Sequence, residues 1–295
     1  DDSIPGIEYS FALYQKYVPV IQLSEVNQLT EQWMTPHNRV LLLSAPEKEG
    51  VEIPTEDELR VIFAAIAQQE LELYQEEVSD EPLLAQLPQP GKVVAERRIE
   101  ELNVTEWQLS NGIRVVLKPT DFQNDEILFS SFSPGGNSLV PDEDYMSALW
   151  SDNLVRESGL GQFTKIDLEK KLADKVLSVS PGVGELYESV SGSASPKDVE
   201  TMLQLLYLTF TAPRLDEAAT TAYLARVREN IKNRLSDPMS VFSDTIWTTM
   251  AQSHFRMRPL TPEILDEIQF DDALDIYKDR FADAGDFSFF FVGNF

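Results

Sequence analysis

The alternation of apolar and polar residues is clearest in the middle of the chain, where it predicts a β-meander. The three strands are expected at residues 107–109, 113–118 and 126–132. Asn111-Gly112, between the first two, supplies the positive φ angles that a tight hairpin turn needs. The third segment is apolar and aromatic with interleaved serines, which favours a strand with one buried face. We expect this strand to end at the turn Ser133-Pro134-Gly135-Gly136.

After this turn the pattern changes repeatedly between the helical period and the strand period. The predicted helices cover residues 142–157, 164–174, 195–210, 215–235 and 241–250, and a further helix is capped at 261–263. Alternation at 177–184 and 186–194 predicts a second hairpin, and 287–293 is typical of a buried strand. The helix at 195–210 is apolar in most positions, so we expect it to be buried nearly all round. Together these elements predict an α+β fold, an antiparallel-rich mixed sheet packed against helices.

The first hundred residues hold fewer elements. Helices are predicted at residues 9–17 and 24–34, with Ser24 as N-cap of the second, and a strand at 40–43. A third helix, at 55–73, begins with a capping box and has an apolar stripe that we expect to be buried, formed by Leu59, Ile62, Phe63 and Ile66. The acidic residues and prolines that follow predict a solvated linker.

An internal repeat indicates parts of two related units. Ile21-Gln22-Leu23, followed by a predicted helix and strand, recurs as Ile268-Gln269-Phe270 at an offset of 247 residues. We therefore predict a tail of a preceding domain at residues 1–50, a helix plus acidic linker at 51–104, and a complete domain at 105–295. Because the first half of the repeated pattern is missing before residue 1, we expect the chain to be a piece of a longer protein.

Charge and composition limit the classes of molecule that the chain can bind. The chain has 24 basic and 50 acidic residues, a net charge of −26, which opposes binding to nucleic acid or to anionic lipid. No apolar run approaches the roughly 18 residues of a membrane span, so we expect no membrane insertion. Cysteine is absent, which excludes disulfides, thiolate metal sites and cysteine nucleophiles.

Histidine is too scarce for a conventional zinc site. The two histidines, His37 and His254, lie far apart, and neither belongs to His-Glu-x-x-His or its inverted form. The serines around the Gly135-Gly136 turn have no histidine nearby to act as a base. The glycine pairs at 159–161 and 182–184 lack the remainder of a phosphate-binding loop. We therefore predict no catalytic residue in this chain.

Four motifs in order resemble the M16 zinc peptidases, the pitrilysin and insulinase family. They are the strand pair at 109–118, the Ser-Pro-Gly-Gly turn at 133–136, Thr209-Phe210-Thr211-Ala212-Pro213-Arg214, and the closing 291–295. The resemblance covers residues 105–295 and, as the end of a preceding domain, residues 17–45. It implies a LuxS/MPP-like fold, four such domains in a clamshell that encloses peptides, and, by similarity to the bacterial branch, a periplasmic location. Within that scheme the chain would be the end of domain two, the linker between the halves, and the inactive domain three.

The resemblance also implies where zinc ligands would lie. In the family's active first domain, the helix after the Gly-Gly turn carries His-x-x-Glu-His, and a glutamate on a later helix completes the zinc shell. The corresponding positions here are Trp150-Ser151-Asp152-Asn153-Leu154, with Glu229, or Asn230, as the later position. The ligand set is absent, with Asp152 and Glu229 as possible remnants. The resemblance therefore implies no cofactor in this chain, Zn²⁺ in an upstream domain of the parent, and peptide substrates and that catalytic half as partners.

Two other classes of function remain open from the sequence. The chain could belong to an inactive M16-like structural or assembly subunit, which the presence or absence of His-x-x-Glu-His upstream would decide. It could also be a small-ligand or metal-binding module that uses its many carboxylates, which a calcium dependence of stability would reveal.

Overall fold

The structure is a computed structural model that describes residues 6–35, 37–45, 50, 52–66, 68–69 and 78–295. The chain divides into two compact units, residues 1–74 and 75–295. Among the described residues, no helix has the length and apolar content needed to cross a membrane.

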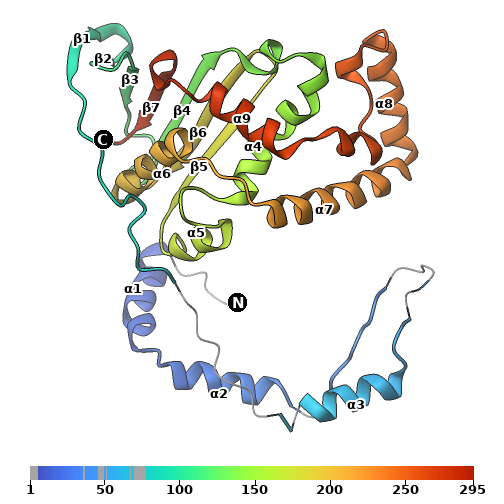
Figure 1. The fold of residues 1–295 in the computed structure, drawn as a ribbon. Coiled ribbons are helices and arrows are strands. Elements are labelled where there is room, and N and C mark those ends of the chain that lie inside the picture. The colour runs from blue at the N-terminus through green and yellow to red at the C-terminus, as the bar shows by residue number, and fades with distance from the viewer. Residues whose placement is uncertain (1–5, 36, 46–49, 51, 67, 70–77) are drawn as a thin grey trace. The chain divides into compact units, whose positions relative to one another are not determined.

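The larger unit contains a seven-stranded mixed sheet (Figure 1). Its strands are β1 (Val93–Ile99), β2 (Val104–Leu109), β3 (Arg114–Pro119), β4 (Ile127–Pro134), β5 (Leu177–Val183), β6 (Tyr187–Ala194) and β7 (Ser288–Gly293). They lie in the order β1-β2-β3-β7-β4-β6-β5, and all neighbours are antiparallel except β3 and β7. The predicted α+β class with an antiparallel-rich mixed sheet is confirmed.

The predicted β-meander is wrong at its third strand. β2 and β3 form the expected hairpin, but β7 lies between β3 and β4 and pairs with both. The physical reason is aromatic packing: the ring of Phe129 on β4 stacks on Phe289 and Phe291 of β7, at centroid distances of 6.2 and 5.2 Å. A strand from the far end of the chain is thereby preferred to the sequence neighbour.

The segment predicted as linker, residues 51–104, contains the first strand of this sheet. β1 pairs antiparallel with β2, from Val93 opposite Leu109 to Ile99 opposite Val104. Its pattern gave no signal, because most of its residues are exposed and three of the seven are charged. An edge strand of this kind needs no buried face.

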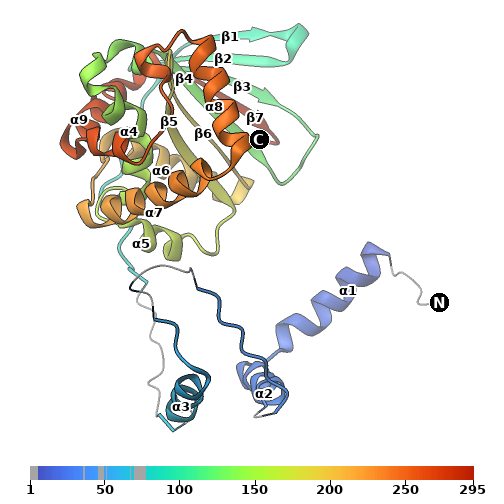
Figure 2. The same ribbon diagram turned by 90° about the vertical axis from the view of Figure 1, so that its right-hand side faces the viewer.

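Within residues 78–295, six α-helices gather on one face of the sheet (Figure 2). They are α4 (Tyr145–Ser158), α5 (Lys165–Lys171), α6 (Val199–Thr211), α7 (Glu217–Leu235), α8 (Pro238–Met250) and α9 (Phe270–Arg280). Alternate residues of β4, from Ile127 to Ser133, are buried against this layer. The main core contains Phe129, Val155, Val190, Met202, Tyr277, Phe281 and Phe287.

The helix α6 is less buried than its apolar sequence predicts. Met202 and Leu205 are buried, but Leu203 and Tyr207 are 42% and 40% exposed. Both exposed side chains line an apolar groove beside β2 and β3, so α6 covers only part of the sheet. Full burial on all sides was therefore a wrong expectation.

The smaller unit contains α1 (Ile7–Tyr17), α2 (Leu23–Trp33) and α3 (Glu56–Ile66). The capping box of α3 is confirmed, since Thr55 and Glu58 exchange hydrogen bonds. The predicted N-cap Ser24 is wrong, because Gln22 and Glu25 form the capping box of α2. The predicted continuation of α3 to residue 73 falls largely outside the described residues.

Two further expectations for this unit are wrong. Residues 40–43 form no strand, and Val40 and Leu42 are 95% and 88% exposed. On α3 the expected buried stripe is largely open, with Ile62, Phe63 and Ile66 all about half exposed. In both places the apolar pattern is present, but the unit's described residues provide no strand or core to cover it.

Candidate functional site

The turn between β4 and α4 depends on glycine. Gly136 has a φ of +62°, and a Cβ atom there would lie 2.3 Å from the carbonyl oxygen of Gly184. Its backbone N–H donates to the Oε2 atom of Glu188 at 2.6 Å. Glu188 is itself buried on β6, so the carboxylate fixes the turn that directs the chain into α4.

Arg256 holds the segment between this turn and α4 from a distance of more than a hundred residues in sequence. Its guanidinium donates to the carbonyl oxygens of Asn137 and Val140 at 2.8 and 2.6 Å, and to Asp142 at 2.7 Å. It also stacks over the ring of Tyr145, 4.7 Å from the centroid. Three hydrogen bonds and a cation–π contact therefore fix the beginning of α4.

The hydroxyl of Tyr145 donates to the Oε1 atom of Glu185 at 2.7 Å. Burial raises the pKa of Tyr145 to about 12, and the hydrogen bond to Glu185 acts in the same direction. The phenol therefore stays protonated and remains a donor throughout the physiological range.

The candidate metal position on α4 is occupied in part by packed side chains. Leu154 is completely buried within a second core cluster, with Met146 and Leu224. The indole of Trp150 packs edge-on against Tyr223 of α7, with ring centroids 6.1 Å apart. The indole nitrogen carries a hydrogen and has no lone pair for a metal, so neither residue can be a ligand.

The polar residues of the same turn are engaged with protein groups. The Oδ1 atom of Asp152 accepts from the backbone N–H and the side-chain amide of Asn153, at 2.8 and 2.9 Å. Burial raises the pKa of the Asp152 carboxyl, while hydrogen bonds from Asn153 and Val183 and the charge of Arg156 oppose this rise.

The amide of Asn153 is similarly occupied. Its Oδ1 atom accepts from the guanidinium of Arg156 at 2.6 Å and from the hydroxyl of Tyr223 at 3.4 Å. On α7, the later position Glu229 is 60% exposed and accepts from Lys232 at 2.7 Å.

The donor set does not fit a zinc ion. Of the residues predicted for the slot, Asp152 and Glu229 alone offer a carboxylate, and zinc in proteins needs three or four thiolate, imidazole or carboxylate ligands. Within the described ranges, no three histidine, aspartate or glutamate side chains are grouped so that they could hold a metal. His37 belongs to the smaller unit, and the Nδ1 atom of His254 accepts from the backbone of Arg256 at 3.2 Å.

Sequence reasoning missed Glu188 and Arg256. Glu188 lies two residues before the buried Val190 on the same strand, so alternation places both side chains on the buried face. An inward-facing carboxylate could therefore have been predicted from the sequence. Arg256 gave no comparable signal, because its partners at residues 137–142 are distant in sequence.

Comparison with known proteins gives relatives along nearly the whole chain. A family-model search finds no match. The chain is 27% identical over 300 residues to "Zinc protease PQQL-like" of Arabidopsis thaliana, which covers 99% of the chain and 28% of the relative. It is 18% identical to "Probable zinc protease PqqL" of Haemophilus influenzae, over 96% of the chain and 30% of the relative. The chain thus spans less than a third of the length of these relatives.

Solved structures agree on the fold. The periplasmic protease PqqL from Escherichia coli superposes with a TM-score of 0.64 at 19% identity, over 82% of this chain and 26% of that one. The ferredoxin protease FusC, solved as a point mutant in complex with Arabidopsis ferredoxin, superposes with a TM-score of 0.62 at 18% identity, over 100% of this chain and 33% of that one. A peptidase M16 inactive domain from Pseudomonas fluorescens superposes with a TM-score of 0.53 at 13% identity, over 66% of this chain and 47% of that one.

Proposed function

Since the chain is related to M16 zinc proteases and its larger unit has the fold of M16 peptidase domains, we propose that it is a non-catalytic segment of a longer M16 zinc metallopeptidase. In this role it forms part of the wall of a clamshell chamber that encloses peptide substrates. The observation that carries the proposal is the state of α4, where Leu154 and Trp150 are packed side chains at the positions expected for zinc ligands. The fold is kept while the ligand set is replaced.

Zinc chemistry therefore belongs, in this proposal, to an upstream part of the parent. There the ion would activate water for peptide hydrolysis. The residues of this chain take no part in that step, because the slot contributes one half-buried carboxylate, Asp152, whose Oδ1 atom is already hydrogen-bonded. The upstream catalytic half of the same protein is the expected partner.

The domain assignment is also part of the proposal. Residues 1–50 would be the end of a preceding M16-like domain, 51–104 the inter-half linker with the first strand, and the rest the inactive domain. Support comes from the repeat, because α9 begins and ends at the same offset from α2, residues 23 to 270 and 33 to 280. Val40 and Leu42 are 95% and 88% exposed, whereas their counterparts Phe287 and Phe289 are 1% and 5% exposed. Such apolar residues would be buried once the preceding domain completes the sheet.

The helix-free face of the sheet is the surface that we propose for the chamber wall. Leu128 and Phe132 of β4 are 50% and 48% exposed there, and the ring of Phe132 stacks on Phe290 at 5.8 Å. Serines on the paired strand β6 surround them. A surface of aromatic and small hydroxyl side chains can contact extended peptides without demanding one sequence. The net charge of −26 would favour basic over acidic peptides by field steering.

The proposal includes a periplasmic location, which is supported by the description of the Escherichia coli relative as a periplasmic protease. It also includes a peptide or protein substrate, which is supported by the complex of the ferredoxin protease with ferredoxin. Fractionation of cells that express the full-length parent tests the location.

Site-directed labelling of the full-length parent, with any cysteine outside this chain replaced by serine, tests the chamber role, because the chain itself contains no cysteine. A thiol-reactive peptide substrate should label Ser130→Cys on the helix-free face, and an uncleavable competitor peptide should suppress this labelling. The matched control Ser236→Cys, exposed at the end of α7, should be labelled equally with and without competitor. Loss of the difference between the two sites would contradict the chamber role. A parent without peptidase activity would instead favour the assembly-subunit alternative.

A further inference from the structure

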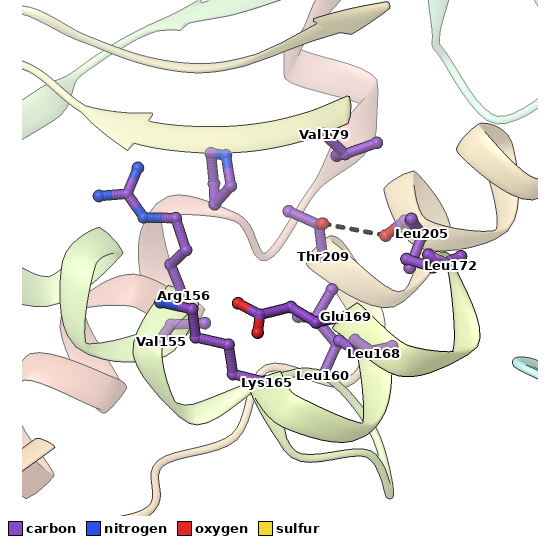
Figure 3. Close-up of a pocket in the computed structure, with 12 residues that line it drawn as sticks. Val155, Arg156, Leu160, Lys165, Leu168, Glu169, Leu172, Val179, Leu205 and Thr209 are labelled. Atoms are coloured by element: carbon purple, nitrogen blue, oxygen red, sulfur yellow. Dashed lines mark hydrogen bonds between the residues drawn. The ribbon is translucent and has the colours of Figure 1, made fainter. Parts of the chain in front are cut away.

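A cavity of about 290 Å³ opens between α4, α5, β5 and α6, beside the α4 slot (Figure 3). Its floor is hydrocarbon. Val155 and Leu205 are buried, and the other apolar lining residues are Leu160, Leu168, Leu172, Val179 and Pro181. This floor suits a branched or aromatic hydrocarbon group.

Three charged side chains stand at the opening of this cavity. Lys165 is already paired, since its Nζ atom lies 2.8 Å from Glu157. Arg156 donates to Asn153 at 2.6 Å and to Ser180 at 3.5 Å, and it forms no ion pair with a carboxylate of residues 78–295. Glu169 makes neither a hydrogen bond nor an ion pair with the described part of the chain. At the opening, Arg156 and Glu169 are therefore a cation and an anion that form no ion pair with the described residues.

The close-up shows how these groups lie relative to the floor. The side chain of Glu169 extends from α5 with its carboxylate towards the side chains of Arg156 and Lys165, and the guanidinium of Arg156 is directed away from that carboxylate, towards Ser180 of β5 (Figure 3). A purely apolar ligand would remove water from Glu169 without giving the carboxylate a partner, which costs free energy. A fatty-acid anion would leave the same carboxylate unpaired. A ligand with a positive group, a negative group and an apolar body satisfies all three features.

We propose that this cavity binds an apolar zwitterion of the α-amino acid type. The hydrocarbon side chain lies on the leucine floor, the ammonium group binds the carboxylate of Glu169, and the carboxylate group binds the guanidinium of Arg156. A free amino acid such as leucine and a short apolar peptide such as leucyl-leucine share this chemistry. The inference does not rest on the proteolytic role, since it uses the cavity alone.

Calorimetric titration of the chain with L-leucine and with leucyl-leucine tests this site and separates the two sources. Binding of either ligand at millimolar concentration supports it, and the tighter one identifies the source. N-acetyl-leucine, which lacks the positive charge, and leucinamide, which lacks the negative charge, should each bind more weakly by about fivefold or more, the worth of one exposed ion pair. Equal binding of all four compounds, or of none, overturns the proposal.

Two surface substitutions assign the charges without disturbing the core. Glu169→Gln should weaken leucine binding about fivefold and leave the affinity for N-acetyl-leucine unchanged. Arg156→Gln should also weaken leucine binding about fivefold, and it should leave the affinity for leucinamide unchanged. The matched controls Glu143→Gln and Arg98→Gln, both outside the cavity, should bind leucine as the unchanged chain does. Equal affinity of Glu169→Gln and Glu143→Gln for leucine would contradict the assignment of Glu169 as the partner of the ligand's ammonium group.

Discussion

The indole of Trp150 on α4 packs edge-on against the phenol ring of Tyr223 on α7, with ring centroids 6.1 Å apart and planes at 62°. The two helices on which the family resemblance would place the zinc ligands are thus joined here by an aromatic contact. Aromatic pairs of this geometry are worth about 1 kcal/mol beyond the area that they bury. The contact gives Trp150 a packing role at the position that the family resemblance aligns with a zinc ligand.

Restoring the metal motif should therefore damage the fold rather than create a site. The substitutions Trp150→His, Asn153→Glu and Leu154→His would place His-x-x-Glu-His on α4. We expect Leu154→His alone to lower the free energy of unfolding by about 3 kcal/mol, because it puts a polar ring into a fully buried apolar position. Urea unfolding measures the loss. Leu186→His, at a residue that is 70% exposed, is the control and should change stability by less than about 0.5 kcal/mol. A triple variant that binds zinc at full stability would contradict this view of α4.

The hydrogen bond from Tyr145 to Glu185 should be visible in the pH dependence of stability. The pKa of Tyr145 is raised to about 12 from 10.0, so the unfolded chain releases this proton at a lower pH than the folded chain. Stability should therefore fall as pH rises from 10 towards 12, and the fall should be smaller for Tyr145→Phe. Below the ordinary pKa of tyrosine the same variant should be less stable by about 1 kcal/mol, through loss of the hydrogen bond.

Thermal unfolding between about pH 8 and about pH 11, on either side of the ordinary tyrosine pKa, measures both effects. Tyr187→Phe is a suitable control, because Tyr187 is 52% exposed. Identical pH profiles for Tyr145→Phe and the unchanged chain would exclude a raised pKa at Tyr145.

Gly136 should be intolerant of any side chain. In Gly136→Ala the added Cβ atom would meet the backbone of Gly184, Glu185 and Tyr187 at less than 3 Å, at a φ of +62°. We expect a loss of about 3 kcal/mol or more in the free energy of unfolding, since backbone cannot move aside cheaply. At Gly91 the nearest atom is the Ser110 hydroxyl oxygen at 3.7 Å, so Gly91→Ala should be close to neutral. Similar unfolding midpoints for the two variants would argue against the role of the turn.

Hydrogen exchange tests whether residues 39–45 are the last strand of a preceding domain. In the chain alone these amides belong to no strand and should exchange rapidly, whereas in the full-length parent they should be protected by two neighbouring strands. Residues 288–293 are the internal control and should be protected in both proteins. Rapid exchange of 39–45 in the parent would contradict the domain assignment.

The extent to which sequence predicted the fold depended on the range of the interactions. Helices such as α7 and the hairpin β5–β6 follow from periodicity, because their burial pattern repeats within a few residues. The family resemblance, which the relatives confirm, rested on short motifs in order. The place of β7 between β3 and β4 could not be found this way, since it depends on aromatic contacts between distant segments.

The sequence predicted the turn beside the candidate site, but not the side-chain contacts within the site. Local motifs predicted the turn at Gly135-Gly136, which the structure confirms. The position of the metal slot on α4 came from the family resemblance and stays a prediction. What occupies the slot could not be inferred, because the Trp150–Tyr223 contact depends on the packing of α7, as the hydrogen bonds of Arg256 depend on a loop far along the chain. The apolar run predicted a strand at 40–43, but a strand exists only when a neighbour pairs with it.

The most direct test of the central claim is the zinc content of the purified chain of residues 1–295 after dialysis against dilute zinc. We predict a stoichiometry near zero, because Trp150, Asn153 and Leu154 provide no ligand and Asp152 is engaged with Asn153. The full-length parent under the same conditions should hold one zinc ion in its upstream half. One tightly bound zinc per isolated chain would contradict the account, since carboxylates and histidines of this segment would then form a metal site of their own.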